Sequence, residues 1–241
     1  MAMTATPVLA LDCSGPACSV AVATKSDDGD IAVLARLTRA MQRGHAAALT
    51  PMIEAALATA GMRPNDLGLI AATIGPGSFT GVRIGLATAR ALAFALGVPL
   101  AGLTTIDILL AGATVADRSQ LQAQRLRLMA AIDTHRGDYY AGFDDSPAPF
   151  VATAAAIAVR AAGSALLIIG DGAPSLAGAL ARSGVDAQPA AGPATPDPAM
   201  LASQALLRGV DNWRTANGRD GMPRPLYLRP ADVTLPKTDA R

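Results

Sequence analysis

The sequence GPGSFTGVRIG, residues 75–85, joins an apolar segment to a segment with helical periodicity. The apolar run 67–74 predicts a buried strand, and Ser78 is a favourable N-cap for a helix over 79–96 that Gly97 ends. A glycine loop at a helix N-terminus can bind an anion, because free N–H groups and the helix dipole point the same way. The loop lacks both the lysine of a P-loop and the third glycine of a dinucleotide fingerprint. A phosphate site and a tight structural turn both remain open.

Upstream of this loop, three short apolar runs separated by turn residues predict strands joined by hairpins. They are VLALD from residue 8, CSVAVAT from residue 18 and IAVLAR from residue 31. Residues 44–60 have helical periodicity and end at Gly61. Pro51 lies inside this segment, so the helix either begins at Thr50 or runs through the proline with a kink. With a further strand over 98–103, the first hundred residues predict three antiparallel strands followed by two helix–strand crossovers onto a mixed sheet.

The second part of the chain has weaker signals. A helix is expected over about 105–115, followed by the polar stretch DRSQLQAQ. RLMAAID and YYAGF, at 127–133 and 139–143, predict a hairpin, and 165–169 predicts a buried strand. A loop over 187–199, a helix over 200–211 and an extended tail complete the chain. Asp12 and Asp133 each end a strand before a turn and a second strand, so the two halves form a weak repeat.

Composition excludes several classes of protein. The 241 residues carry 20 Lys and Arg against 19 Asp and Glu, a net charge of +1, which argues against a charge-driven nucleic-acid binder. No 18-residue run is uninterruptedly apolar, and the N-terminus lacks a basic signal region, so we expect a cytoplasmic protein with no membrane contact. The two cysteines, Cys13 and Cys18, do not form a CxxC motif, and no disulfide is expected. Glu54 is the single glutamate, so an acid–base centre would rest almost wholly on aspartates.

Three local features each allow two interpretations. Small residues recur every four positions on the predicted helix 79–96, at Gly81, Gly85 and Ala89. This face allows close packing either on the chain's own sheet or on a partner helix. Asp12 and its neighbouring hydroxyls fit an ordinary capped turn, or the phosphate hairpin of actin-like ATPases. His45 has no second histidine within a helical turn, so we expect it at a surface or capping position rather than as a metal ligand.

Taken together, five stretches resemble the TsaB (YeaZ) family, bacterial proteins needed to make threonylcarbamoyladenosine in tRNA. They are LDCSGPACSVAV (11–22), RGHAAALTPMIEAAL (43–57), the block from GPGSFTGVRIG to TTIDIL (75–109), AIDTHRGDYYAGF (131–143) and PLYLRPADV (225–233). The resemblance implies an α/β protein of the actin-like (ASKHA) fold, with two related domains that each have a mixed β-sheet flanked by helices. The expected domains are 1–103, with the dimerisation helices, and 104–241, more divergent and with an extended C-terminal tail.

The family is a paralogue of the catalytic subunit TsaD, which transfers threonylcarbamoyl to N6 of adenosine 37 in tRNAs that read codons starting with A. In that subunit an HxxxH motif holds a metal. Here Thr105 and Leu109 stand at the matching positions, and neither side chain replaces a metal-binding imidazole. The resemblance therefore implies a non-catalytic scaffold or activating subunit of the transferase complex, without a metal or catalytic residue and without activity alone.

The resemblance also implies partners. We expect TsaD to bind through helices of the first domain, a P-loop ATPase of the TsaE type to join, a homodimer to form in the absence of partners, and tRNA to be contacted mainly through the partner. The interface residues predicted are Leu49, Met52, Ile53, Leu57, Phe79, Arg83, Leu86 and Arg90. No tightly bound cofactor is expected. ATP or ADP at the partner interface stays open, with Asp12, Ser14, Gly77 and Ser78 as its candidate contacts.

Two other functions remain as alternatives. A self-sufficient ATP-dependent transferase or kinase would use the Asp12 hairpin and the 75–78 loop around a nucleotide. A metallopeptidase is the weaker alternative, because His45 and His135 are the only histidines and lie about ninety residues apart.

Overall fold

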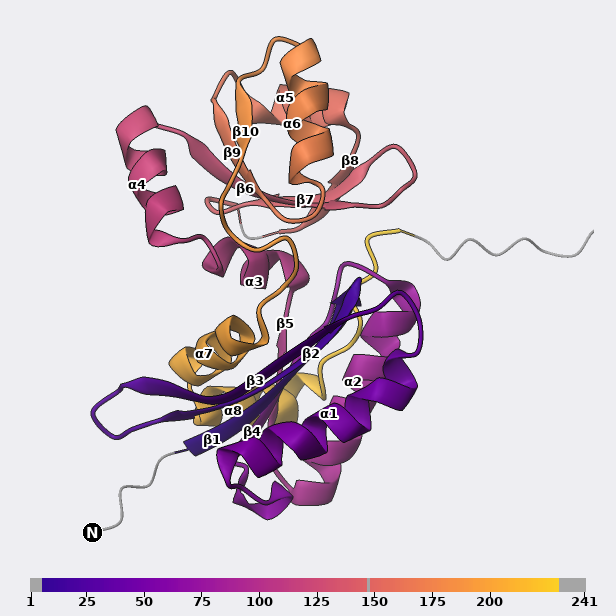
Figure 1. Ribbon diagram of the computed structural model, residues 1–241, viewed down its shortest axis with the longest axis vertical. Coiled ribbons are helices and arrows are strands. Elements are labelled where there is room, and N and C mark those ends of the chain that lie inside the picture. Colours follow the sequence, from indigo (N-terminus) through magenta and orange to yellow (C-terminus); the bar gives the residue numbers. More distant parts are fainter. Residues whose placement is uncertain (1–5, 147, 230–241) are drawn as a thin grey trace, which may run out of the picture.

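The computed structural model describes residues 6–146 and 148–229, which form two five-stranded sheets flanked by helices (Figure 1). The strands are β1 (Thr6–Gly15), β2 (Ala17–Lys25), β3 (Ile31–Ala40), β4 (Leu69–Thr73), β5 (Leu100–Leu103), β6 (Arg127–Asp133), β7 (Tyr139–Phe143), β8 (Phe150–Ala152), β9 (Leu166–Ile169) and β10 (Ala187–Pro189). The helices are α1 (His45–Ala60), α2 (Phe79–Leu96), α3 (Thr105–Ala111), α4 (Val115–Gln124), α5 (Ala154–Ala161), α6 (Ala173–Arg182), α7 (Pro198–Arg208) and α8 (Val210–Asp220), with a 3-10 turn at Pro64–Asp66.

The two sheets have the same topology. The first has the strand order β3-β2-β1-β4-β5, and the second has β8-β7-β6-β9-β10. In each, the central strand pairs antiparallel with the next strand in sequence and parallel with the fourth. Asp12 and Asp133 lie near the ends of the equivalent strands β1 and β6, which confirms the repeat predicted from them. This duplicated mixed-sheet arrangement is the one that an actin-like fold predicts.

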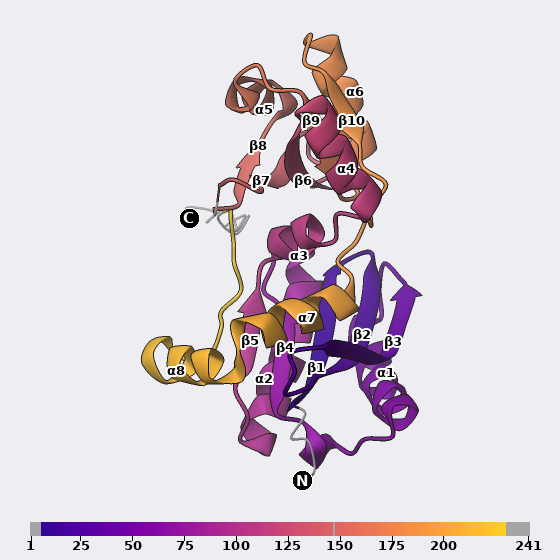
Figure 2. The same ribbon diagram turned by 90° about the vertical axis from the view of Figure 1, so that its left-hand side faces the viewer.

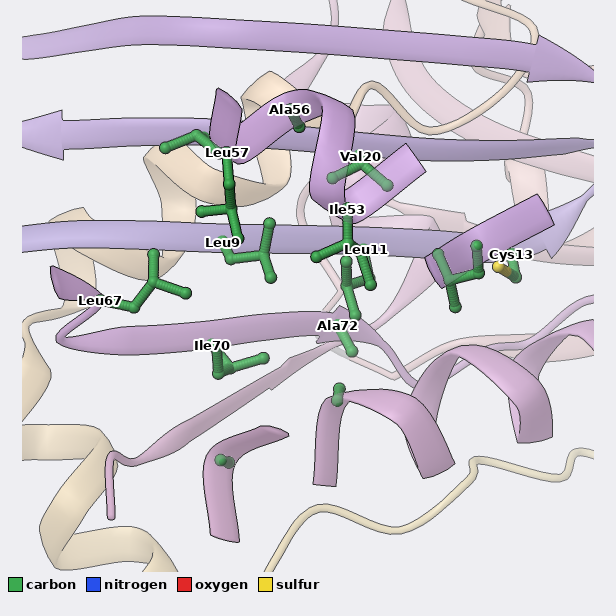
Figure 3. Close-up of a cluster of buried hydrophobic side chains, with 14 of the residues drawn as sticks. Leu9, Leu11, Cys13, Val20, Ile53, Ala56, Leu57, Leu67, Ile70 and Ala72 are labelled. Carbon is green, nitrogen blue, oxygen red and sulfur yellow. The ribbon is translucent and has the colours of Figure 1, made fainter. Parts of the chain in front are cut away.

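The first sheet is covered on both faces because its strands alternate apolar side chains. Leu9 and Leu11 of β1 point into a cluster with α1 and α2, where Figure 3 shows them beside Ile53 and Leu57. Val8 and Ala10, which alternate with these leucines, point to the opposite face, which α7 covers. Figures 1 and 2 show α7 and the α1–α2 pair on opposite sides of this sheet.

Helix α2 has the bounds predicted from its caps. The Ser78 side chain accepts a hydrogen bond from the Gly81 N–H at 3.2 Å, and Gly97 ends the helix in the left-handed conformation. By length and composition α2 could cross a membrane, and it is the one helix in the described part of the chain that could. Its buried stripe, which includes Leu86 and Ala89, instead packs on β1 and β4 of its own sheet.

Helix α1 resolves the ambiguity at Pro51, because the helix begins at His45 and continues through the proline. The second half differs more from the sequence expectations. Helix α3 ends at Ala111, short of the end predicted at residue 115, and the polar stretch that follows belongs to a second helix, α4, which begins at Val115. The loop predicted over 187–199 contains the short strand β10, and the helix predicted over 200–211 is interrupted at Gly209.

Two helices connect the halves of the molecule. In α3, Ile106 and Leu109 pack into the second sheet, whereas Ile108 packs into the first. Helix α7 follows the second sheet in sequence but packs on β1 and β2 of the first. The two sheets lie on either side of the boundary predicted at residue 103, and α7 and α8 return across it to the first sheet. The end of the predicted C-terminal tail, from residue 230, lies outside the described residues.

Candidate functional site

A cavity of about 790 Å³ lies between the two domains. The first domain contributes the β1–β2 hairpin, the glycine loop and the start of α2. The second contributes the β6–β7 hairpin and Asp171, and residues 226–229 complete the wall. The predicted nucleotide contacts Ser14, Gly77 and Ser78 line this cavity together, whereas Asp12 lies beneath them.

Asp12 is 1% exposed and held by three hydrogen bonds to a single oxygen. Its Oδ1 accepts from the Ser14 N–H at 3.1 Å, from the Ser14 hydroxyl at 2.6 Å and from the Thr73 hydroxyl at 2.5 Å. Its Oδ2 has no hydrogen-bond partner within the described residues. Burial raises the pKa of Asp12, and the two hydroxyl groups oppose part of that rise. The carboxyl group is therefore sealed below the cleft.

The glycine loop lies directly against the first hairpin. The Ser78 N–H donates to the Ser14 carbonyl oxygen at 2.7 Å. A Cβ on Gly77 would lie 2.2 Å from that oxygen, and one on Gly81 would lie 1.9 Å from the Cys13 carbonyl oxygen. These glycines are needed for backbone contact inside the chain.

That contact decides how well the loop fits a nucleotide phosphate. The Ser14 hydroxyl and N–H already donate to Asp12, and the Ser78 N–H donates to the hairpin. At these two residues both backbone N–H groups and the Ser14 hydroxyl donate within the chain, whereas the Ser78 hydroxyl accepts from the Gly81 N–H. Ser14, Gly77 and Ser78 come together at the cavity, and three of the donors of Ser14 and Ser78 are already used within the chain. Fewer donors are then left for the phosphate that the self-sufficient transferase or kinase would bind at this loop.

The second domain places two carboxyl groups at the cleft, Asp133 at the end of β6 and Asp171 after β9. The Asp133 N–H donates to Asp171 Oδ1 at 3.0 Å, and the His135 N–H donates to Asp133 Oδ1 at 2.7 Å. Burial raises the pKa of Asp171, and the neighbouring charge of Asp133 adds to that effect. Asp171 is not among the site residues predicted from the sequence, although its position after the buried strand β9 matches that of the loop after β4. Within residues 6–146 and 148–229, no three His, Cys, Asp or Glu side chains are grouped to hold a metal.

The two histidines differ in environment. His135 lies in the predicted turn with a largely exposed side chain, 3.6 Å from Asp133. His45 is the first residue of α1 and is 6% exposed, so the surface or capping position predicted for it is wrong. Its Nε2 has no hydrogen-bond partner among the described residues. Although it is buried, His45 belongs to none of the hydrophobic clusters of the described residues and lines the cavity.

The predicted partner interface divides into two groups. Four of its side chains are between 1% and 6% exposed and pack in the hydrophobic cluster between the first sheet, α1 and α2: Leu49, Ile53, Leu57 and Leu86. Met52 packs against the same cluster. A partner that docks on the folded chain does not reach these side chains. The helical period correctly identifies an apolar face, but the chain's own sheet covers that face.

The remaining three predicted residues contact the C-terminal segment. Arg83 donates from Nε to the Tyr227 hydroxyl at 2.7 Å, and its guanidinium lies 3.7 Å from the centre of the Phe79 ring. Arg90 donates from Nε to the Pro223 carbonyl oxygen at 3.0 Å. Phe79 remains 48% exposed, so this end of α2 is still open to a partner.

Helix α3 contains the two positions at which the resemblance placed metal-binding histidines in the catalytic subunit. Thr105 and Leu109 are each 1% exposed. Leu109 packs in the second core, and the Thr105 hydroxyl has no hydrogen-bond partner in the described part of the chain. Both side chains are enclosed in the joint between the domains.

A family model and two curated relatives show which proteins this chain is similar to. The family model described as "TsaD: tRNA N6-adenosine threonylcarbamoyltransferase" matches residues 37–169, more than half of the chain. An uncharacterised protein of Mycobacterium tuberculosis is 31% identical over 230 residues, which cover 94% of this chain and 93% of that protein. The tRNA threonylcarbamoyladenosine biosynthesis protein TsaB of Escherichia coli is 35% identical over 133 residues, 55% of this chain and 52% of that protein.

A solved structure extends the likeness to most of the chain. The structure of YeaZ from Pseudomonas aeruginosa has a TM-score of 0.69 and 26% sequence identity to this chain. It covers 92% of this chain and the whole of its own. The match includes both sheets, so the likeness extends beyond the segment aligned with the Escherichia coli protein.

Proposed function

Because this chain belongs to the TsaB (YeaZ) family, we propose that it is the non-catalytic subunit of the complex that forms threonylcarbamoyladenosine in tRNA. The observation that carries the non-catalytic assignment is the position of Thr105 and Leu109. Where the catalytic paralogue has two histidines, this chain encloses a hydroxyl and an alkyl group in the joint between its domains. Its contribution is then architectural, and the threonylcarbamoyl transfer takes place on the paralogue.

We assign the contact with the catalytic paralogue, of the TsaD type, to the outer face of α1 and α2. The inner face of this pair is closed by the sheet, but its outer face carries small exposed side chains such as Ala58, Ala87 and Ala91. Phe94 on the same side of α2 is 82% exposed. Small side chains allow close helix approach, and an exposed aromatic ring provides apolar area for an interface of roughly 800 Å² per partner.

The same face accounts for the proposed homodimer. A paralogue with the same fold presents equivalent helices, so a face that pairs with the paralogue can also pair with itself about a twofold axis. Self-association is then expected when the paralogue is absent and should compete with complex formation. A P-loop ATPase of the TsaE type would join the paired subunits.

Contacts with tRNA and nucleotide are assigned mainly to the partners. A net charge of +1 provides few of the cations that phosphate neutralisation requires. The engaged donors of Ser14 and Ser78 support a chain that holds no nucleotide tightly by itself. An ATP or ADP at the partner interface would then be held chiefly by the partner. We place the protein in the cytoplasm, with its tRNA.

The test combines genetics with surface variants. In cells that lack this protein, threonylcarbamoyladenosine in tRNA should fall and should be restored by the wild-type chain, as measured by mass spectrometry. Ala91→Glu and Phe94→Glu should each lose co-purification of the catalytic paralogue and fail to restore the modification. The matched control is Val159→Glu on α5, because Val159 is 81% exposed on the other domain.

Two results would overturn this proposal. Unchanged tRNA modification in the deletion strain would remove the function itself. Normal co-purification by both folded α2 variants would remove the interface but leave the function intact.

A further inference from the structure

The C-terminal segment 221–229 crosses from the first domain to the second. It follows α8, contains neither helix nor strand, and extends along the molecule towards the second sheet (Figure 2). The polypeptide also crosses between the domains before α3 and again in residues 190–197. Figures 1 and 2 show the 221–229 segment and residues 190–197 on opposite sides of the molecule, between the two sheets.

The first domain holds the segment through its backbone. The Leu226 N–H donates to the Ile74 carbonyl oxygen at 2.7 Å, and Arg90 donates to the Pro223 carbonyl oxygen. The Pro223 ring lies so close to β5 that a Cβ on Gly102 would be 2.5 Å from it. Backbone hydrogen bonds and close packing fix this end in register.

Tyr227 continues the contact at the start of α2. Its hydroxyl accepts from Arg83, and its ring centre lies 5.4 Å from that of Phe79. The Arg83 guanidinium stacks on the Phe79 ring at 3.7 Å, an arrangement that combines aromatic and cation–π attraction. The segment is therefore secured to the first domain as far as the edge of the cleft.

The second domain holds the segment through a side chain. Arg229 forms an ion pair with Asp138 in the β6–β7 turn, and its guanidinium lies 5.9 Å from the centre of the Tyr140 ring. The two ion-paired side chains are 25% and 20% exposed. A partly exposed ion pair holds less firmly than the backbone bonds and packing on the other domain.

From these contacts we propose that residues 222–229 form a latch that holds the two domains closed over the cleft, with Arg229 and Asp138 as its releasable end. The latch also forms part of the wall of the 790 Å³ cavity, because Leu226 to Arg229 line it. Release of the ion pair frees the domains to rotate about their two covalent crossings and opens the cavity. The device operates within one chain and does not depend on the proposed partner.

The experiment measures the distance between the domains in the full chain. Spin labels on Thr59→Cys in α1 and Ser183→Cys after α6 report the separation, because both positions are exposed and both natural cysteines are buried. We expect Asp138→Asn and Arg229→Gln each to increase the population at longer distances roughly three- to tenfold. The matched control is Asp145→Asn, which removes the Arg127–Asp145 ion pair inside the second domain and should leave the distances unchanged.

A charge exchange distinguishes the latch from local damage to the β6–β7 turn. The double variant with Asp138→Arg and Arg229→Asp should restore the wild-type distance distribution while each single reversal opens it. Wild-type distances in both single variants, or the same opening in the Asp145→Asn control, would overturn the latch. Opening that the exchanged pair does not reverse would also overturn it, because the effect would then come from the turn and not from the ion pair.

Discussion

A glycine-to-alanine pair tests whether the glycine loop is closed against the first hairpin. Gly81 lies in α2, where a Cβ would be 1.9 Å from the Cys13 carbonyl oxygen. To reach ordinary contact at 3.4 Å, the helix or the hairpin must move by about 1.5 Å, which is 3.4 minus 1.9. Gly178 lies in α6, where the nearest atom to a Cβ is the flexible Arg182 guanidinium at 3.8 Å.

The two substitutions should therefore change stability in opposite directions. Alanine in place of an exposed helical glycine stabilises by about 1 kcal/mol, so Gly178→Ala should raise the melting temperature by about 2–4 °C. At Gly81 the same gain is opposed by about 3 kcal/mol of overpacking against backbone. The net loss of about 2 kcal/mol should lower the melting temperature by about 4–8 °C.

Differential scanning calorimetry of both variants decides the matter. Gly85→Ala provides an intermediate control, because its Cβ would meet Cys13 atoms at 3.5 to 3.8 Å, which is ordinary van der Waals contact. If Gly81→Ala melts at or above the temperature of the wild type, the loop is not in contact with the hairpin and the argument against a phosphate site fails.

Three further predictions follow from the same residues. Because burial raises the pKa of Asp12, the folded chain keeps a proton that the unfolded chain loses as pH rises. The free energy of unfolding should therefore fall as pH rises between the folded and unfolded pKa values of this group. Asp12→Asn should flatten that dependence in urea titrations from pH 4 to 8. Ser14→Ala and His135→Ala should leave reconstituted tRNA modification within a few-fold of wild type, whereas loss of a catalytic group would cost 10²-fold or more. Leu57→Glu and Leu86→Glu should unfold the first domain rather than release a folded partner, and circular dichroism with normal helix content in both would contradict their burial.

The sequence predicts most of the first domain because its signals are local. Ser78 and Gly97 bound α2 through their own hydrogen bonds and backbone conformation, and neither depends on distant residues. Helix α4 has a comparable local signal at its N-terminus, although the predictions from the sequence do not include this helix. Thr114 and Asp117 form a reciprocal capping box three residues apart, which marks a helix start in a stretch whose polarity suggests a loop.

The candidate site was harder to predict because its contacts join distant parts of the chain. The period of α1 shows that Leu49 and Leu57 share a face, but a partner and the chain's own sheet produce the same period. Tyr227 and Arg229 carry no local pattern, since Arg83 and Asp138 lie 144 and 91 residues away. Only the tertiary structure shows that the C-terminal segment and the cleft belong together.

The equivalent carboxyl groups Asp12 and Asp133 now lie in different environments. This difference allows the position of the glycine loop and the chemistry of the carboxyl group to be tested separately. Asp133 lines the cleft, whereas Asp12 is sealed because the Ser78–Ser14 contact closes the loop above it. The same contact fixes the first turn of α2, whose outer face we assign to the partner. A displaced α2 in Gly81→Ala should therefore weaken co-purification of the catalytic paralogue, even where the chain remains folded.

Asp12→Asn provides the contrast, because it keeps the acceptor oxygen for Ser14 and Thr73 and leaves the loop closed. It should retain partner binding and tRNA modification. If Asp12→Asn instead abolishes modification while the complex still assembles, the carboxyl group has a chemical role that its burial does not reveal, and the architectural assignment fails. If both variants behave like wild type, the loop contact does not set the position of α2.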